Sequence, residues 1–293
     1  DGLGSKKGCK VIGAVLAVLF SLFCLLASFG IGNMSQINSI AENMQSAFSV
    51  PKIATGVVLL VIAALVIVGG IKRIASVAEK LVPFMAIAYV IGALVIFFAN
   101  IDQAGAVFSA IFKGAFALRA VGGGIVGAGV KQALTWGMKR GVFSNEAGLG
   151  SSVMVHSSSN VKEPVRQGMW GIFEVFADTM VVCTLTAFAV LSSGLVDLNT
   201  GAVLSASSGS ALVGEAFSSV FGSFGQAFIA LAILLFAFTT CLGWSHYGTK
   251  ACEYLFGTKS TIVYRVIFVA FILCGAVTVS YTHLRAHETL RHL

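Results

Sequence analysis

Five glycines lie within the nine residues 121–129, in a stretch that is otherwise apolar. Glycine in a helix interior costs about 1 kcal/mol relative to alanine, so this stretch predicts a helix that unwinds part-way along. Unwound helices expose backbone N–H and C=O groups, which secondary transporters use to bind small polar substrates and ions. The alternative is that these glycines only allow helices to pack closely.

Two carboxylates, Glu174 and Asp178, lie four residues apart in a second apolar stretch, and therefore on one face of a helix. A carboxylate at the centre of a bilayer costs at least about 2.5–3.5 kcal/mol, so each must face protein or water. One interpretation is a cation or proton pathway. The other is a structural pair, hydrogen-bonded to neighbours such as Thr179 and to the connector that precedes the helix.

Two other places supply groups that could hold a small ligand. Thr239 and Thr240 offer hard oxygen ligands for a cation such as Na⁺, although threonine hydroxyls also bond back to the preceding helical turn. Residues 28–33, Ser-Phe-Gly-Ile-Gly-Asn, combine an aromatic side chain, close backbone approach and an amide. The alternative there is helix packing next to a polar helix end.

The polar connector 139–152 and the cysteines argue against an enzyme. The connector has no nucleophile spaced to meet a base, and nearby His156 has no obvious partner; Ser144 or Asn145 is suited to capping a short helix. The six cysteines form no C-x-x-C pair, and no phosphate-binding G-x-x-x-x-G-K-[ST] motif occurs. We therefore expect no catalytic residues, no organic cofactor and no primary pump.

The composition explains where these groups must sit. Of the 293 residues, 57% are hydrophobic and only 11% are charged, whereas soluble domains carry about 25% charged residues. This predicts an all-α polytopic membrane protein in a lipid bilayer. The net charge of +7 would suit a nucleic-acid partner, but the basic residues cluster between apolar runs, so we expect none.

Seven stretches meet or approach the roughly 20 apolar residues that a membrane-spanning helix needs: 11–32, 54–71, 81–98, 121–137, 169–191, 220–243 and 262–279. Pro83 suits the first turn of the third, and 104–118 and 208–219 suit interfacial or re-entrant helices. Alternate threading puts thirteen basic residues on one side and three on the other. The loops with Lys6, Lys72, Arg140 and Lys250 are therefore expected in the cytoplasm.

Together these segments resemble the alanine or glycine:cation symporter family, also called sodium:alanine symporters. The most specific piece is residues 141–150, Gly-Val-Phe-Ser-Asn-Glu-Ala-Gly-Leu-Gly, in which Asn145, Glu146, Gly148 and Gly150 stand out. Supporting blocks at 27–33, 69–73, 78–85, 183–186, 236–244 and 254–256 follow in the family's order, and the resemblance covers nearly all of 11–278.

The resemblance implies a partial five-plus-five inverted-repeat bundle of the leucine-transporter type. It implies Na⁺-driven, sometimes H⁺-driven, uptake of alanine or glycine by alternating access at a bacterial plasma membrane. Phe29 and Trp244 would close a small pocket, and Thr239 and Thr240 would bind sodium. Backbone groups would come from Gly123, Gly124, Ile125, Val126 and Gly127.

The sequence also departs from the family pattern. Family members have earlier spans, with a second discontinuous helix, so residues 1–280 are expected to be a partial transporter domain that is inactive alone. Residues 281–293 do not resemble the family's continuation and are expected to be an artefactual tail. Alternatives from other classes are a seven-span receptor or retinal protein and a channel or scaffold; residues 262–279 lack the lysine that a retinal Schiff base requires.

Overall fold

The computed structural model describes residues 9–116, 134–135, 137–138, 141, 144–146, 148–207 and 209–278. The regular elements in these ranges are helices, and one isolated antiparallel bridge joins Val196 to Val203. Five helical stretches within them are long and apolar enough to cross a membrane: 10–48, 70–99, 164–192, 223–256 and 260–277. The all-α polytopic membrane class is confirmed. The count of seven spans and the inverted repeat stay predictions.

The first span is longer than the sequence indicated. Helix α1 (Lys10–Phe29) passes through a π-helical turn, η1 (Gly30–Met34), into α2 (Ser35–Phe48), which makes 39 continuous residues. The predicted end near residue 32 is therefore wrong. The polar residues after 34 stay helical because α2 is amphipathic and buries one apolar face. That face carries Ile37, Ile40 and Ala41.

The next two helices correct further details. Helix α3 (Lys52–Val68) follows Pro51, and α4 (Gly70–Ala99) holds Pro83 in its interior, not in its first turn. The residues before Pro83 form helix readily, so α4 begins well before the apolar run. For the same reason Lys72 lies in α4 and Lys250 lies in α11 (Ser223–Phe256), where loops were expected.

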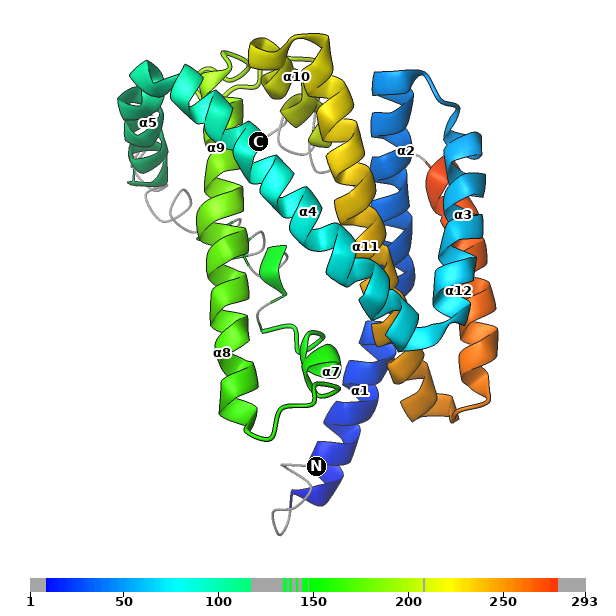
Figure 1. Cartoon of the computed structure of the whole chain (residues 1–293). Coiled ribbons are helices and arrows are strands. Elements are labelled where there is room, and N and C mark those ends of the chain that lie inside the picture. The colour runs from blue at the N-terminus through cyan, green and yellow to red at the C-terminus, as the bar shows by residue number, and fades with distance from the viewer. Residues whose placement is uncertain are drawn as a thin grey trace, which may run out of the picture. The chain divides into compact units, whose positions relative to one another are not determined.

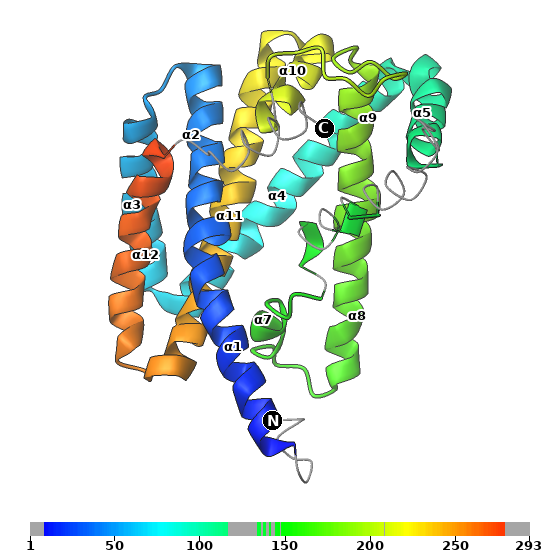
Figure 2. The ribbon, with the colours of Figure 1, turned by 180° about the vertical axis from the view of Figure 1, so that it is seen from behind.

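Residues 1–85 and 230–293 form one compact unit. In it α2, α3 and α12 (Ser260–Val277) lie side by side, as Figures 1 and 2 show from opposite sides. Their shared core includes Ile37, Ile67 and Phe268. Gly56 lets α3 approach α12 closely, because a Cβ there would lie 2.5 Å from the Cβ of Ala276.

Residues 86–229 form the second unit. After the short η2 (Ile101–Gln103) come α5 (Ala104–Phe116), α7 (Val153–His156) and α8 (Pro164–Val175). The helix of α8 continues through a π-helical turn, η3 (Phe176–Cys183), into α9 (Thr184–Ser192), and α10 (Ser210–Phe221) follows. The fifth predicted span, 169–191, is thus confirmed as helix. Ser144 and Asn145 are themselves helical rather than placed before a helix as caps, and α7 begins after Ser152.

A carboxylate anchors the loop between α9 and α10. Glu215 accepts hydrogen bonds from the hydroxyls of Ser205, at 2.6 Å, and Ser207. These bonds favour the ionised form and lower the pKa of Glu215. A lowered pKa means that the bonds stabilise the fold above the ordinary glutamate pKa, and that this contribution is lost as the pH falls through the lowered value.

We expect the loop to loosen in acid for this reason. Hydrogen exchange of residues 203–207, corrected for intrinsic rates, should show protection at pH 7 that falls below about pH 4.5. Glu215→Gln should lower the protection already at pH 7, whereas Asp102→Asn, at an exposed site in η2, should not. Equal protection in E215Q and the parent would contradict the anchor.

Candidate functional site

Trp244 lies against the π-helical turn of the first span. Its side chain is only 8% exposed, and a Cβ on Gly32 would lie 2.5 Å from the Trp244 Cβ. The absence of a side chain at Gly32 therefore lets α11 approach η1 with the indole between them. Both residues belong to the first unit, so the contact is internal to it.

Phe29 lies one turn earlier and packs against α12. Its ring centroid is 5.2 Å from that of Tyr264 and 5.0 Å from that of Phe271. Ser28 and the Tyr264 hydroxyl are hydrogen-bonded at 2.9 Å beside them. Phe29, one predicted pocket wall, therefore belongs to the same stretch of the first span, residues 29–32, on which the other predicted wall, Trp244, packs.

The predicted sodium ligands bond within their own helix. Thr239 donates to the carbonyls of Leu235 and Phe236 at 2.9 and 3.0 Å, and Thr240 donates to Phe236 at 2.9 Å. This is the alternative that threonine in a helix always offers. A hydroxyl that donates keeps lone pairs that a cation could use, so these contacts leave the sodium role as a prediction.

The glycine-rich candidates lie outside the described residues. They are Gly123, Gly124, Ile125, Val126 and Gly127, and the loop cations Lys6 and Arg140 also lie outside. Residues 281–293 lie outside as well. The roles expected for all of these stay predictions.

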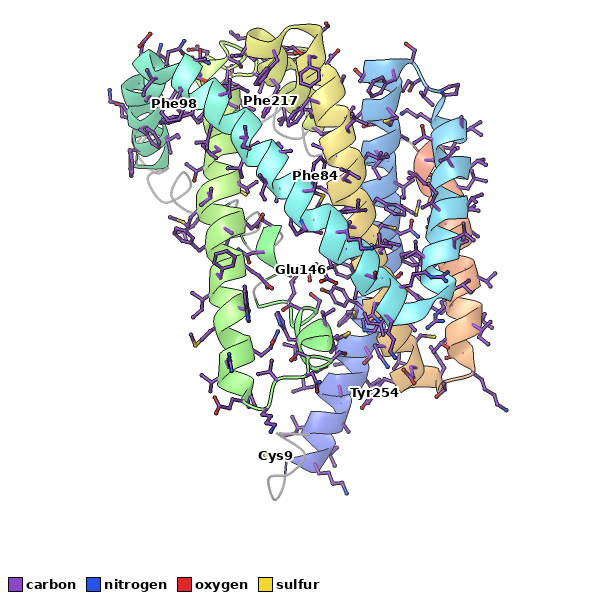
Figure 3. All side chains as sticks on the ribbon, in the orientation of Figure 1. Cys9, Phe84, Phe98, Glu146, Phe217 and Tyr254 are labelled. Carbon is purple, nitrogen blue, oxygen red and sulfur yellow. The ribbon has the colours of Figure 1, made fainter. Side chains whose placement is uncertain are left out.

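The motif segment begins with two contacts to the span 164–192. Ser144 donates to Asp178, and Asn145 Nδ2 donates to Thr179 Oγ1 at 2.8 Å. The chain then turns at Glu146, which is labelled in Figure 3 and has a φ of 55°. Ser151 donates to the Glu146 carboxylate at 2.6 Å and closes the turn.

The motif glycines have backbone conformations that suit glycine. Gly148 has a φ of 87° and Gly150 a φ of 80°, in the region that side chains disfavour. A substitution at either would strain this turn. The glycines of the motif therefore shape the segment, and Asn145 and Glu146 fasten it.

Asp178 contacts the motif itself, through Ser144, and Glu174 contacts His156, six residues after the motif ends. His156 Nε2 lies 3.5 Å from the Glu174 carboxylate, and His156 Nδ1 lies 2.8 Å from Gln167 Nε2. The expectation that His156 lacks a partner is wrong, because its partners come from α8, after an intervening loop. These are the contacts of a structural pair, while a cation or proton pathway stays a prediction.

Three buried polar atoms of the first unit lack a hydrogen-bond partner among the described residues, on Asn33, Thr55 and His246. Asn33 donates from Nδ2 to the Phe268 carbonyl at 2.7 Å but leaves Oδ1 unpaired. His246, 6% exposed on α11, leaves Nε2 unpaired. Asn33 supplies the amide of the candidate segment 28–33, whereas His246 was not a sequence candidate; a polar side chain inside an apolar run was the available signal.

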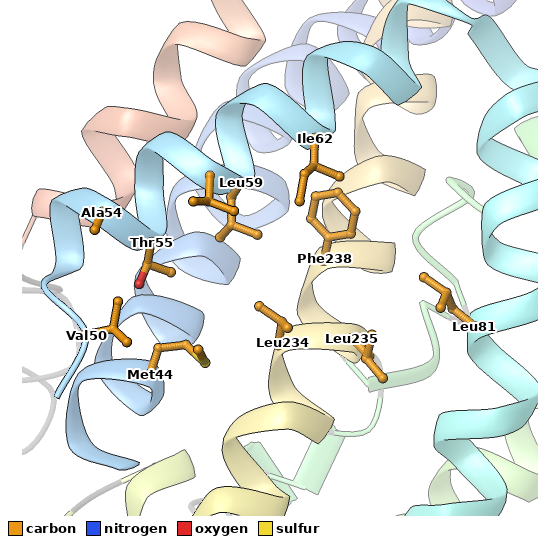
Figure 4. A pocket seen from close by; sticks show the side chains of 11 residues that line it. Met44, Val50, Ala54, Thr55, Leu59, Ile62, Leu81, Leu234, Leu235 and Phe238 are labelled. Atoms are coloured by element: carbon orange, nitrogen blue, oxygen red, sulfur yellow. The ribbon is translucent and has the colours of Figure 1, made fainter. Parts of the chain in front are cut away.

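An apolar groove of about 370 Å³ lies in the same unit, between α3 and α11 (Figure 4). Thr55 is its polar lining residue, and the Thr55 hydroxyl is buried without a hydrogen-bond partner among the described residues. Those predicted site residues that the structure describes do not line this groove. Its apolar walls do not suit a zwitterion, which requires partners for two charges.

Within the described part of the chain, no group of three or more His, Cys, Asp or Glu side chains could hold a metal ion.

Relatives of this chain are membrane carriers. It is 41% identical to the sodium/alanine symporter AgcS of Methanococcus maripaludis over 271 residues, which are 90% of this chain and 57% of that protein. It is 35% identical to the sodium/proton-dependent alanine carrier protein of Bacillus sp. PS3, over 84% of this chain and 57% of that protein. It is also 37% identical to the probable sodium/glutamine symporter GlnT of Bacillus subtilis, over 91% and 53%.

The chain spans a little over half the length of these curated relatives. The family model for sodium:alanine symporters matches residues 1–288, including part of the segment 281–293, whose separate origin stays a prediction. A symporter family agrees with the expectation of a transport protein rather than an enzyme. The motif at 141–150, the apolar helices and this match together show that the chain belongs to the sodium:alanine symporter family.

Proposed function

We propose that the protein carries alanine into the cell together with Na⁺. The observation that carries the proposal is the 41% identity to a sodium/alanine symporter over 90% of this chain. The packing of Trp244 on Gly32 supports it, since it places a large aromatic wall beside a helix position that has no side chain. Such a wall suits a substrate as small as alanine or glycine.

The residue roles in this proposal follow the chemistry of the substrate. If the glycine run unwinds as the sequence predicts, backbone groups at Gly123, Gly124, Ile125, Val126 and Gly127 would bind the carboxylate and ammonium groups of the zwitterion. Phe29 and Trp244 would enclose its methyl group, and Thr239 and Thr240 would supply oxygens to sodium. Asp178 and Glu174 would hold the motif segment.

The driving force in this proposal is the sodium gradient. Each positive charge that enters gains about 2.3 kcal/mol per 100 mV of membrane potential, in addition to the concentration gradient. Alternating access would couple this to alanine movement, in a plasma membrane with Lys6, Lys72, Arg140 and Lys250 on the cytoplasmic side.

Uptake into proteoliposomes tests the proposal. The protein at its natural full length should accumulate labelled alanine when an inward sodium gradient is imposed, and a sodium ionophore should abolish the accumulation. Competition with unlabelled glycine, glutamine and serine would rank the substrates. Uptake without sodium dependence, or a sodium current unaffected by alanine, would contradict symport and favour a channel.

A further inference from the structure

Two neighbouring residues of the motif meet two neighbouring residues of the span 164–192 in register. Ser144 pairs with Asp178 and Asn145 with Thr179, and each pair is separated by 34 positions. A second attachment follows at His156, which contacts Gln167 and Glu174 of α8. The segment is thus fastened at both ends to one continuous helix.

The π-helical turn η3 explains how adjacent residues can both reach the motif. In a π-helix the hydrogen bonds run from i to i+5, so the turn is wider than in an α-helix. Successive side chains then diverge less around the helix axis. Asp178 and Thr179 lie in this turn, and π-helical turns inside α-helices are frequent at functional sites.

Among the described residues of the segment, hydrogen bonds rather than apolar packing make the contacts to the span. The described apolar side chains Leu149, Val153 and Val155 remain exposed, by 42%, 62% and 42%. Apolar contacts are non-directional, whereas the paired hydrogen bonds have a defined geometry. The register of the motif on the span therefore depends on Asp178 and Thr179.

We infer that Asp178 and Thr179 are positioning residues that hold the motif, through Ser144 and Asn145, in the register that transport requires. For its transport readout the inference rests on the proposed function. Asp178 acts by accepting the Ser144 hydrogen bond, without carrying ions.

Thr179→Val in the full-length protein removes the acceptor for Asn145 while keeping the side-chain shape. We expect the half-saturating alanine concentration to rise about tenfold, the effect of one hydrogen bond, with the sodium Hill coefficient unchanged. Thr179→Ser should restore the parent value. Thr184→Val, the same change at an exposed position of α9, is the matched control. T179V behaving like T184V would overturn the inference.

Two substitutions of Asp178 distinguish a positioning role from a role in ion conduction. Asp178→Asn keeps an oxygen that accepts the Ser144 hydrogen bond, so we expect it to retain most of the sodium-driven uptake. Asp178→Leu has no acceptor and should lose it. Loss of uptake in D178N to the level of D178L would overturn the positioning role and favour a pathway carboxylate.

A cross-link tests the register without any transport measurement. Ser144 Oγ lies 3.5 Å from Cys183 Sγ, so Ser144→Cys should form a disulfide with Cys183 on mild oxidation, detected by mass spectrometry of the linked peptides. S144C combined with Cys183→Ala is the control. Absence of the disulfide would overturn the register itself, whereas a disulfide in a protein without sodium-driven uptake would refute only the proposed function.

Discussion

Gly248→Ala should destabilise the protein, although alanine is ordinarily the better helix former. A Cβ at this position of α11 would overlap the Tyr264 hydroxyl, lie 2.5 Å from its Cζ and lie 2.6 Å from Ser28 Oγ. Tyr264 is 3% exposed and Ser28 is fully buried, so neither can move without repacking the core. Overpacking of this kind costs about 1–3 kcal/mol, and we expect a melting temperature roughly 5–10 °C lower.

The same helix supplies the control. Among the described residues outside its own helix backbone, no atom lies within 4 Å of the position that a Gly243 Cβ would occupy, so Gly243→Ala should leave the melting temperature unchanged or raise it slightly. Adding Tyr264→Phe to G248A removes the nearest clashing atom and should recover part of the loss. Equal melting temperatures for G248A and G243A, measured in the same detergent, would show that the close approach of α11 to Ser28 and Tyr264 is wrong.

Gly32→Ala should have the largest effect on transport. The new Cβ would lie 2.5 Å from the Cβ of Trp244, at the root of that side chain, so the whole indole would have to shift. If Trp244 is a wall of the alanine pocket, as proposed, a displacement near 1 Å can cost up to about a hundredfold in rate. We therefore expect sodium-driven alanine uptake by the full-length protein to fall at least about tenfold.

Gly30→Ala is the matched control in the same π-helical turn, because no atom of the described chain outside that helix backbone lies within 4 Å of its Cβ position. It should transport nearly as well as the parent. The melting temperature of each variant, and the amount of it that is present in the membrane, show whether it folds. Normal uptake by well-folded G32A would remove Trp244 from the proposed pocket.

The sequence by itself determined the class of the protein. Apolar runs near 20 residues predict membrane helices because the bilayer thickness and the rise per residue are fixed, and each described run is helical. The motif 141–150 identified the family, which the match over residues 1–288 confirmed. The helix ends were less well predicted, as at Gly32 and Pro83, because a helix continues into polar residues whenever one face remains buried.

Only the tertiary structure decided which polar groups meet. The sequence left Glu174 and Asp178 open between a pathway and a structural pair; their partners, His156 and Ser144, lie 18 and 34 positions away. Likewise the sequence does not distinguish Gly243 from Gly248. A Cβ on Gly248 would meet Tyr264, whereas a Cβ on Gly243 would meet no described atom within 4 Å outside its own helix backbone. Periodicity along one helix predicts a buried face, but which atoms occupy that face depends on a second helix, and local propensity carries no information about it.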